Sequence, residues 1–317
     1  MNMKISIPNI FTYLFLLLAL FATASCSDLT DQKTVDIDPQ HAKEQNPELW
    51  ARYMEALRTY RQSEHFITYG SFDNGTEKPK NEGAYLRSLP DSLDIVTPTH
   101  PESLTSYDYE DILLLQEKSI KVLYLVDYTA QMSTLTDAAK LGAWLDKAIA
   151  TASQLGMNGF AIKGTPLYGG TEAEQAARRE AAKLIVSKLS AAVGDGKLLV
   201  FEGDPAFIDA ADLNKLDYVV LNTTTITSAV DLKLYVAGVI ENFSIPKEKL
   251  LLSAKINEKL VNEDGKKLDA ITEMTNRVVS LGPVGGLAIY ALGDDYYHTK
   301  MNYEISRLAI QIMNPSK

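Results

Sequence analysis

Short apolar segments alternate with amphipathic segments along most of this chain. The apolar segments cover residues 65–70, 93–97, 121–127, 157–163, 197–202, 217–222, 250–256 and 285–291. Their nearly continuous hydrophobicity is typical of parallel strands that are buried on both faces. The amphipathic segments, which predict helices, cover residues 47–63, 138–155, 172–193, 231–242, 268–281 and 302–313.

Eight such strand–helix units in roughly 250 residues match the size of one β/α barrel. The alternative is a doubly wound open sheet, which would carry a glycine-rich phosphate turn after an early strand. The sequence contains no G-x-G-x-x-G motif. We therefore predict an α/β fold, a single TIM-type (β/α)8 barrel over residues 47–317.

The first residues are typical of an export signal. Lys4 is the only charge before an apolar run over residues 10–22, which is short for a permanent membrane span. Small residues precede Cys26, as in a bacterial lipobox, although Thr23 stands where a branched aliphatic residue is more usual. We predict a lipoprotein signal peptide over residues 1–25, a lipid on Cys26 and a polar tether over residues 26–46. The alternative is ordinary cleavage that leaves a free thiol.

Composition excludes several classes of function. The formal net charge is −10, which argues against nucleic-acid binding because phosphates require clustered Lys and Arg. Cys26 is the only cysteine, so an internal disulfide and a cysteine-based zinc site are both excluded. The histidines show no metal-ligand spacing, and a G-x-S-x-G nucleophile motif is absent. We predict no cofactor and no metal.

In a β/α barrel, functional side chains gather at the carboxyl ends of the strands. Aromatic rings there can stack on sugar rings, and polar side chains can bind the sugar hydroxyls. The predicted glycan-binding residues are Tyr69, Phe72, Asp73, Asp127, Tyr128, Glu202, Asn222, Lys255 and Tyr290. Three further tyrosines, Tyr168, Tyr296 and Tyr297, also lie near predicted strand ends.

The predicted fourth strand carries a resemblance to a known family. Residues 157–165 read M-N-G-F-A-I-K-G-T, and they lie where glycoside hydrolase family 18 has its D-G-x-D-x-D-x-E signature. With the flanking segments L-D-I-V-T-P, L-D-Y-V-V-L-N and G-G-L-A-I-Y-A-L-G-D-D-Y, the chain resembles the endo-β-N-acetylglucosaminidase-like lipoproteins of gut Bacteroidetes from about residue 47 to residue 317. The four acidic positions of the signature are occupied by Asn158, Ala161, Lys163 and Thr165.

The resemblance implies a family mechanism in which the signature Glu protonates the leaving oxygen. In that mechanism a neighbouring Asp orients the N-acetyl group of the substrate, which acts as the nucleophile. A threonine hydroxyl cannot donate a proton near neutral pH, and Ala161 cannot orient a substrate group. We therefore expect no catalytic residue in this motif.

These observations lead to one preferred function and two alternatives. The preferred function is a non-catalytic, lipid-anchored protein that captures oligosaccharides containing N-acetylglucosamine, of the N-glycan type, for uptake. The first alternative is a divergent endo-β-N-acetylglucosaminidase that uses displaced carboxylates such as Asp127, Glu202 or Asp204. The second is a structural partner of an outer-membrane uptake complex without a sugar site.

The expected location follows from the anchor. We predict the outer membrane at the cell surface, with its periplasmic face as the alternative, because Ser27 and Asp28 after the lipidated cysteine are compatible with surface export. Contact with the membrane would be made through the lipid alone.

Overall fold

A computed structural model describes residues 42–75, 79, 81–164, 168–280 and 284–315. The predicted signal peptide, Cys26, most of the predicted tether and Thr165 lie outside the described residues. The described part begins with a short helix α2 (Ala42–Gln45) and a longer helix α3 (Pro47–Gln62), which has a proline at its first position. Among the described helices, none has the length and apolar character needed to cross a membrane.

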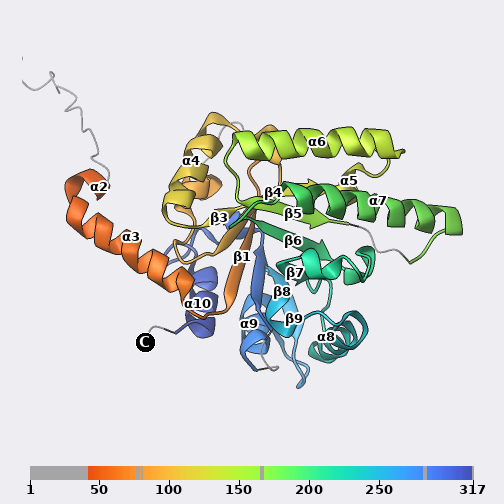
Figure 1. Ribbon diagram of the computed structural model, residues 1–317. Coiled ribbons are helices and arrows are strands. Elements are labelled where there is room, and N and C mark those ends of the chain that lie inside the picture. The colour runs from red at the N-terminus through yellow and green to blue at the C-terminus, as the bar shows by residue number, and fades with distance from the viewer. Residues whose placement is uncertain (1–41, 76–78, 80, 165–167, 281–283, 316–317) are drawn as a thin grey trace, which may run out of the picture. The chain divides into compact units, whose positions relative to one another are not determined.

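The centre of the fold is a ring of parallel strands (Figure 1). The strands are β1 (Ile67–Phe72), β2 (Ile95–Pro98), β3 (Lys121–Val122), β4 (Tyr124–Asp127), β5 (Gly159–Lys163), β6 (Leu198–Gly203), β7 (Tyr218–Leu221), β8 (Leu250–Lys255) and β11 (Gly286–Tyr290). Only Leu123 separates β3 from β4, and its N–H donates to the carbonyl of Val96 at 2.9 Å. Because β3 pairs with β2 and β4 pairs with β5, the two form one barrel strand that closes the ring. The predicted (β/α)8 barrel is confirmed.

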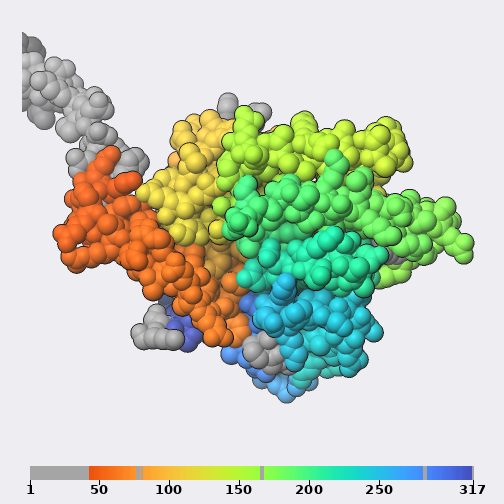
Figure 2. Space-filling view, viewed as in Figure 1, coloured from red at the N-terminus to blue at the C-terminus, as the bar shows by residue number. Residues whose placement is uncertain are grey.

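Helices surround this ring. They are α4 (Ser106–Glu117), α5 (Tyr128–Gln131), α6 (Ala138–Gln154), α7 (Glu172–Ala192), α8 (Ala229–Phe243), α9 (Ala270–Ser280) and α10 (Glu304–Met313). The longest two, α6 and α7, lie side by side and form a continuous surface on one side of the barrel (Figures 1 and 2). The predicted amphipathic helices are confirmed, with ends within about two residues of those expected.

The structure departs from eight complete strand–helix units in two places. Among the described residues, β1 and β6 are followed by 3-10 turns instead of α-helices: η1 (Glu82–Ala84) and η2 (Leu86–Ser88) after β1, and η4 (Pro205–Phe207) and η5 (Leu213–Lys215) after β6. Phe207 in η4 is fully buried and stacks on Phe201 with 5.7 Å between ring centroids. Phe207 of η4 thus packs on the outward side chain Phe201 of β6, in the place where a barrel helix usually packs.

Several elements were not predicted. Besides α2, which lies in the predicted polar tether, and α5, they include a helix and two short strands. Helix α4 begins with a capping box, in which the Asp108 carboxylate accepts from the Thr105 N–H at 2.8 Å and the Asp108 N–H donates to the Thr105 hydroxyl at 3.3 Å. Its apolar residues do not follow a helical period, since Leu113 and Leu114 are exposed. The antiparallel pair β9 (Lys259–Val261) and β10 (Lys267–Asp269) lies between β8 and α9.

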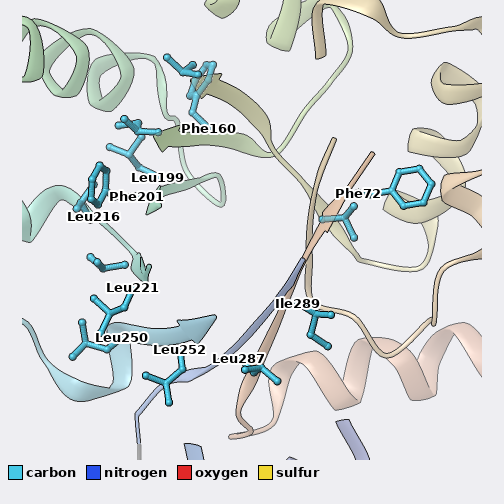
Figure 3. Close-up of a cluster of buried hydrophobic side chains, with 14 of the residues drawn as sticks. Phe72, Phe160, Leu199, Phe201, Leu216, Leu221, Leu250, Leu252, Leu287 and Ile289 are labelled. Carbon is cyan, nitrogen blue, oxygen red and sulfur yellow. The ribbon is translucent and has the colours of Figure 1, made fainter. Parts of the chain in front are cut away.

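The strands bury side chains on both sides of the ring because successive residues point in opposite directions. The outward side chains pack against the helices; Phe72, Phe160, Phe201, Leu252 and Leu287 are examples (Figure 3). The inward side chains form a second cluster inside the barrel, made of Tyr69, Ile95, Leu123, Leu125, Ala161, Val200, Val220, Leu251 and Ala288. Beyond this layer, the next inward positions of β4, β5, β6 and β11 carry polar side chains at the carboxyl end of the barrel.

Candidate functional site at the carboxyl end of the barrel

A buried carboxylate lies at the centre of this end of the barrel. Glu202 near the end of β6 is only 4% exposed. One of its oxygens accepts from the Tyr69 hydroxyl and the other accepts from the Tyr290 hydroxyl at 2.6 Å. The Tyr69 oxygen also lies 2.6 Å from Thr97 Oγ1. Since a tyrosine has one hydroxyl proton, Tyr69 accepts from Thr97 when it donates to the carboxylate.

We call Glu202, Tyr69, Tyr290 and Thr97 the axial network. In the ring of strands, β6 lies opposite β1, so the Glu202 side chain reaches across the barrel axis to Tyr69. The network therefore closes the interior of the barrel just below its carboxyl end.

Burial controls the protonation of this network. Loss of solvation raises the pKa of Glu202, while the two tyrosine hydroxyls and the charge of Lys163 act in the opposite direction. Burial, followed by the nearby Glu202 charge, raises the pKa of Tyr69 and of Tyr290 well above the usual range. Both tyrosines therefore stay neutral and can donate to the carboxylate.

An ion pair lies beside the axial network. Lys163 Nζ is 3.5 Å from Asp127 Oδ2, and the strand register pairs Asp127 with Lys163 and Lys163 with Glu202. The Asp127 carboxylate also accepts from the Ala130 N–H at 2.9 Å and so caps α5. The adjacent strands β4, β5 and β6 thus place Asp127, Lys163 and Glu202 at one level of the barrel, with the lysine between the two carboxyl groups.

The residues at the signature positions lie at different levels along β5 and do not form one site. Asn158 lies at the opposite, amino end of β5, where its side-chain oxygen accepts from the Val122 N–H at 3.0 Å. Ala161 is fully buried in the inner layer, and Lys163 lies at the carboxyl end. Thr165 lies outside the described residues.

The signature position that the chain keeps has a structural role. Gly159 has φ +126, and a Cβ at this position would lie 1.9 Å from the carbonyl oxygen of Leu198 on the neighbouring strand. Only glycine permits this backbone conformation and this close approach. Gly159 is thus the residue that β5 needs in order to pair with β6.

Three predicted polar residues are exposed, and none bonds to the axial network within the described chain. Lys255 lies next to Tyr290 in the strand register and 3.5 Å from Glu258. Asn222 accepts from the Thr224 hydroxyl at 3.0 Å. Asp73 lies 3.5 Å from His100 Nε2.

The four predicted aromatic residues differ in where their rings are buried. Phe72 is fully buried and Tyr128 is 5% exposed, and both pack in the core outside the strands. The Tyr69 ring is buried inside the barrel, and Tyr290 is partly buried above it. In this structure, neither Phe72 nor Tyr128 presents its ring to a ligand at the carboxyl end.

Several exposed rings remain near strand ends. Tyr168 is 63% exposed, and its hydroxyl donates to Asp204 at 2.5 Å, a bond that raises its pKa to about 12. Tyr297 is 69% exposed and meets Tyr296 edge to face at 4.8 Å.

Sequence reasoning missed a second pair of rings. Tyr107, in the first turn of α4, packs edge to face on Tyr85 at 5.7 Å, and the Arg87 guanidinium lies 4.1 Å from the Tyr85 ring centroid. The signal that could have located Tyr107 is the capping box at Thr105 and Asp108, because it marks the start of a helix directly after β2.

Within the described residues, no group of three or more His, Cys, Asp or Glu side chains is placed to hold a metal ion. The side chains described at this end of the barrel include hydroxyls, carboxylates, lysines and exposed rings.

Known structures share the fold of this chain. A structure of BT1044 with a Glu-to-Gln substitution is similar to the chain, with a TM-score of 0.69 and 18% identity over 87% of this chain and 96% of that one. An endo-β-N-acetylglucosaminidase from Cordyceps militaris has a TM-score of 0.62 and 18% identity over 83% of this chain and 95% of that one.

A third similar structure is a chitinase catalytic domain from Ostrinia furnacalis in complex with penta-N-acetylchitooctaose. It has a TM-score of 0.61 and 12% identity over 80% of this chain and 97% of that one. At these identities the structures show a shared fold. No curated protein matches the chain in a sequence comparison.

A family model gives the more specific result. The model described as "Glycoside hydrolase family 18, BT1044-like" matches residues 30–140 and 127–312, which together span the barrel. The chain therefore belongs to glycoside hydrolase family 18, in its BT1044-like group.

Proposed function

We propose that this protein is a non-catalytic, lipid-anchored glycan-binding protein that captures oligosaccharides containing N-acetylglucosamine, of the N-glycan type, for uptake. The observation that carries the proposal is the state of the signature strand. Ala161 and Lys163 occupy two of its acidic positions, and Asn158, at a third, lies at the far end of the strand. A barrel in this state keeps its shape without the acid that the family mechanism needs.

The three displaced carboxylates considered above already have partners. Asp127 pairs with Lys163 and caps α5, and Glu202 accepts from two tyrosines. Asp204 accepts from the Ala206 N–H at 2.9 Å and from the Tyr168 hydroxyl. Each performs a structural task, which supports binding over hydrolysis.

The ligand class follows from the fold relatives and from the exposed rings. One relative is named for its action at N-acetylglucosamine, and another was solved with an oligomer of that sugar. The exposed faces of Tyr168 and Tyr297 offer stacking surfaces for sugar rings, with Lys163, Asn222 and Lys255 available to sugar hydroxyls. We therefore place glycan binding on the exposed rim, above the axial network.

A second candidate function rests on Glu202. Burial raises its pKa, and a raised pKa is what a general acid near neutral pH requires. A divergent endo-β-N-acetylglucosaminidase could use this displaced carboxylate. Such an enzyme would lose all hydrolysis in Glu202→Gln, which keeps the side-chain volume but cannot ionise.

Calorimetric titration with an N-glycan that carries a chitobiose core, followed by mass spectrometry of the same sample, tests the proposal. We expect saturable binding and an unchanged glycan mass. Tyr168→Ala should weaken binding about fivefold, because stacking on an aromatic ring contributes about 1 kcal/mol. Tyr109→Ala is the matched control, since Tyr109 is also an exposed tyrosine but lies on α4.

Either of two results would contradict the proposal. Release of the glycan from its chitobiose core identifies an enzyme, and the Glu202→Gln variant then tests the acid. If the protein binds no glycan of a broad array, the remaining hypothesis is that it is a structural partner of an uptake complex without a sugar site.

We also propose that Cys26 carries the lipid that holds the protein at the outer membrane, with the cell surface as its location. The basis is the signal-like sequence before this single cysteine. In bacteria grown with radiolabelled palmitate, the wild-type protein should be labelled and should sediment with membranes. Cys26→Ser should lose the label and become soluble, because each buried CH₂ group contributes about 0.8 kcal/mol of membrane affinity. Labelling that persists in the variant would refute lipidation at this residue.

A further inference from the structure

A cavity of about 480 Å³ lies at the end of the barrel opposite the axial network. This volume is within the range of sites that bind small molecules. The cavity is lined by residues at or next to the beginnings of six strands, among them Ile67, Ile95, Lys121, Asn158, Leu198 and Tyr218. It therefore lies at the amino end of the barrel, away from the axial network and the proposed glycan site.

The deep wall of this cavity is apolar. Ile95 is 2% exposed, and Ile67, Leu198 and Tyr218 pack against the inner cluster of the barrel. Ile120, 1% exposed, adds a further aliphatic side chain from the segment before β3. Such a wall favours a ligand with an apolar body.

The charged groups around the cavity are mostly cationic. Arg58, Arg61 and Lys121 line it, and Asp94 is the acid among the lining residues. Asp94 is already satisfied, because one oxygen lies 2.9 Å from His65 Nε2 and the other accepts from the Thr68 N–H at 2.8 Å. Of the three cations, Arg58 pairs with Glu55, which does not line the cavity. The excess of positive charge favours an anion.

Several lining donors have no acceptor within the described chain. The Arg61 Nε–H is buried without a partner, although Nη2 of the same side chain donates to the carbonyls of Asp91 and Leu93. The oxygen of Asn158 accepts from Val122 and Gln116, which leaves its NH₂ group as a donor without a bond. The Tyr218 hydroxyl likewise makes no hydrogen bond to any described residue. Of these donors, the Arg61 Nε–H is the buried one, and Asn158 and Tyr218 line the cavity. Because an unpaired buried donor is costly, this site favours a molecule that brings acceptor atoms.

We propose that the amino end of the barrel binds a small organic oxyanion, a carboxylate or phosphate group attached to an apolar body. The acceptor oxygens would take the donors of Arg61, Asn158 and Tyr218, and the apolar body would cover Ile67, Ile95 and Leu198. Water alone would supply acceptors but would neither balance the charge nor cover the aliphatic wall. This site is independent of the proposed glycan function.

Calorimetric titration of the purified protein with phenyl phosphate tests this proposal, with benzyl alcohol and inorganic phosphate as partial probes. We expect saturable one-to-one binding of phenyl phosphate and binding at least about tenfold weaker for each partial probe. Tyr218→Phe, which removes one donor, should weaken phenyl phosphate binding about fivefold. Arg58→Gln should weaken it by a similar factor and reduce its dependence on salt.

Arg179→Gln is the matched control, because Arg179 is an exposed arginine of α7 that does not line the cavity. It should bind phenyl phosphate as the wild type does. Glycan binding by the Tyr218 and Arg58 variants should remain unchanged, so the two sites are tested separately. The proposal is wrong if phenyl phosphate does not bind, if benzyl alcohol binds equally well, or if the Tyr218 and Arg58 variants behave as Arg179→Gln does.

Discussion

Replacing Gly159 with alanine should lower the free energy of unfolding by more than about 4 kcal/mol, a large part of the roughly 5–15 kcal/mol that is typical of folded domains. The added Cβ would lie 1.9 Å from the carbonyl oxygen and 2.7 Å from the amide nitrogen of Leu198. These are backbone atoms of the neighbouring strand, so the clash is relieved only if β5 and β6 move apart. The φ of +126 adds strain for any residue with a side chain. Urea denaturation followed by circular dichroism measures the loss, and the yield of soluble protein measures a complete failure to fold.

Gly156→Ala is the control for this substitution. Gly156 also has a positive φ, +62, but a Cβ there would have no heavy atom within 4 Å. Its replacement should cost only the strain of the left-handed conformation, about 1 kcal/mol. If the two variants were destabilised equally, the contact between β5 and Leu198 would not be the reason that glycine remains in the degenerate signature.

Replacing Glu202 with alanine should lower the free energy of unfolding by about 3–5 kcal/mol. The substitution removes the acceptor of two buried tyrosine hydroxyls and leaves a void at the barrel axis. Glu202→Gln keeps the volume and one acceptor oxygen, so it should cost about 1–2 kcal/mol at most. The same urea experiment compares the two variants.

The pH dependence of Glu202→Gln gives an independent check. Burial raises the folded-state pKa of Glu202 above its unfolded value, so the folded protein binds the proton more tightly. The contribution of Glu202 to the free energy of unfolding of the wild type is therefore greatest below its pKa in the unfolded state, about 4.3. This contribution declines as the pH rises through the pKa of Glu202 in the folded state. Glutamine does not titrate, so the stability of Glu202→Gln relative to wild type should improve over that interval. Glu241→Gln, an exposed site on α8, should track the wild type at every pH. A flat difference for Glu202→Gln would mean that its carboxyl is not in the buried state seen here.

The strands were readily predicted because a parallel barrel buries both faces of each strand. Nearly continuous apolar runs such as residues 197–202 and 285–291 follow from that burial, and all eight runs became barrel strands. Helix α4 was missed because its apolar side chains are shared between a buried and an exposed face. The segments after β1 and β6 were expected to be helical because a barrel usually alternates, whereas Phe207 covers β6 without a helix.

The candidate site was only partly predictable. The strand-end rule brought Asp127, Lys163, Glu202 and Tyr290 to one end of the barrel, as expected. It did not distinguish inward from outward positions. Phe72 lies an odd number of residues from the inward Tyr69, and by the alternation of strand side chains it points into the outer core.

The sequence by itself determined the family, the order of the strands and the loss of the signature acids, because each depends on residue types at fixed spacing along the chain. Only the tertiary structure decided that Glu202 bonds to Tyr69, from which it is 133 residues distant in sequence. That contact exists because the ring of strands closes and places β6 opposite β1. Closure also brought Asn158 together with residues of other strands, among them Ile67, Ile95 and Tyr218, around the cavity at the amino end. A pattern along one strand records the spacing of its residues, but the partners that meet across a barrel are set by how all eight strands pair.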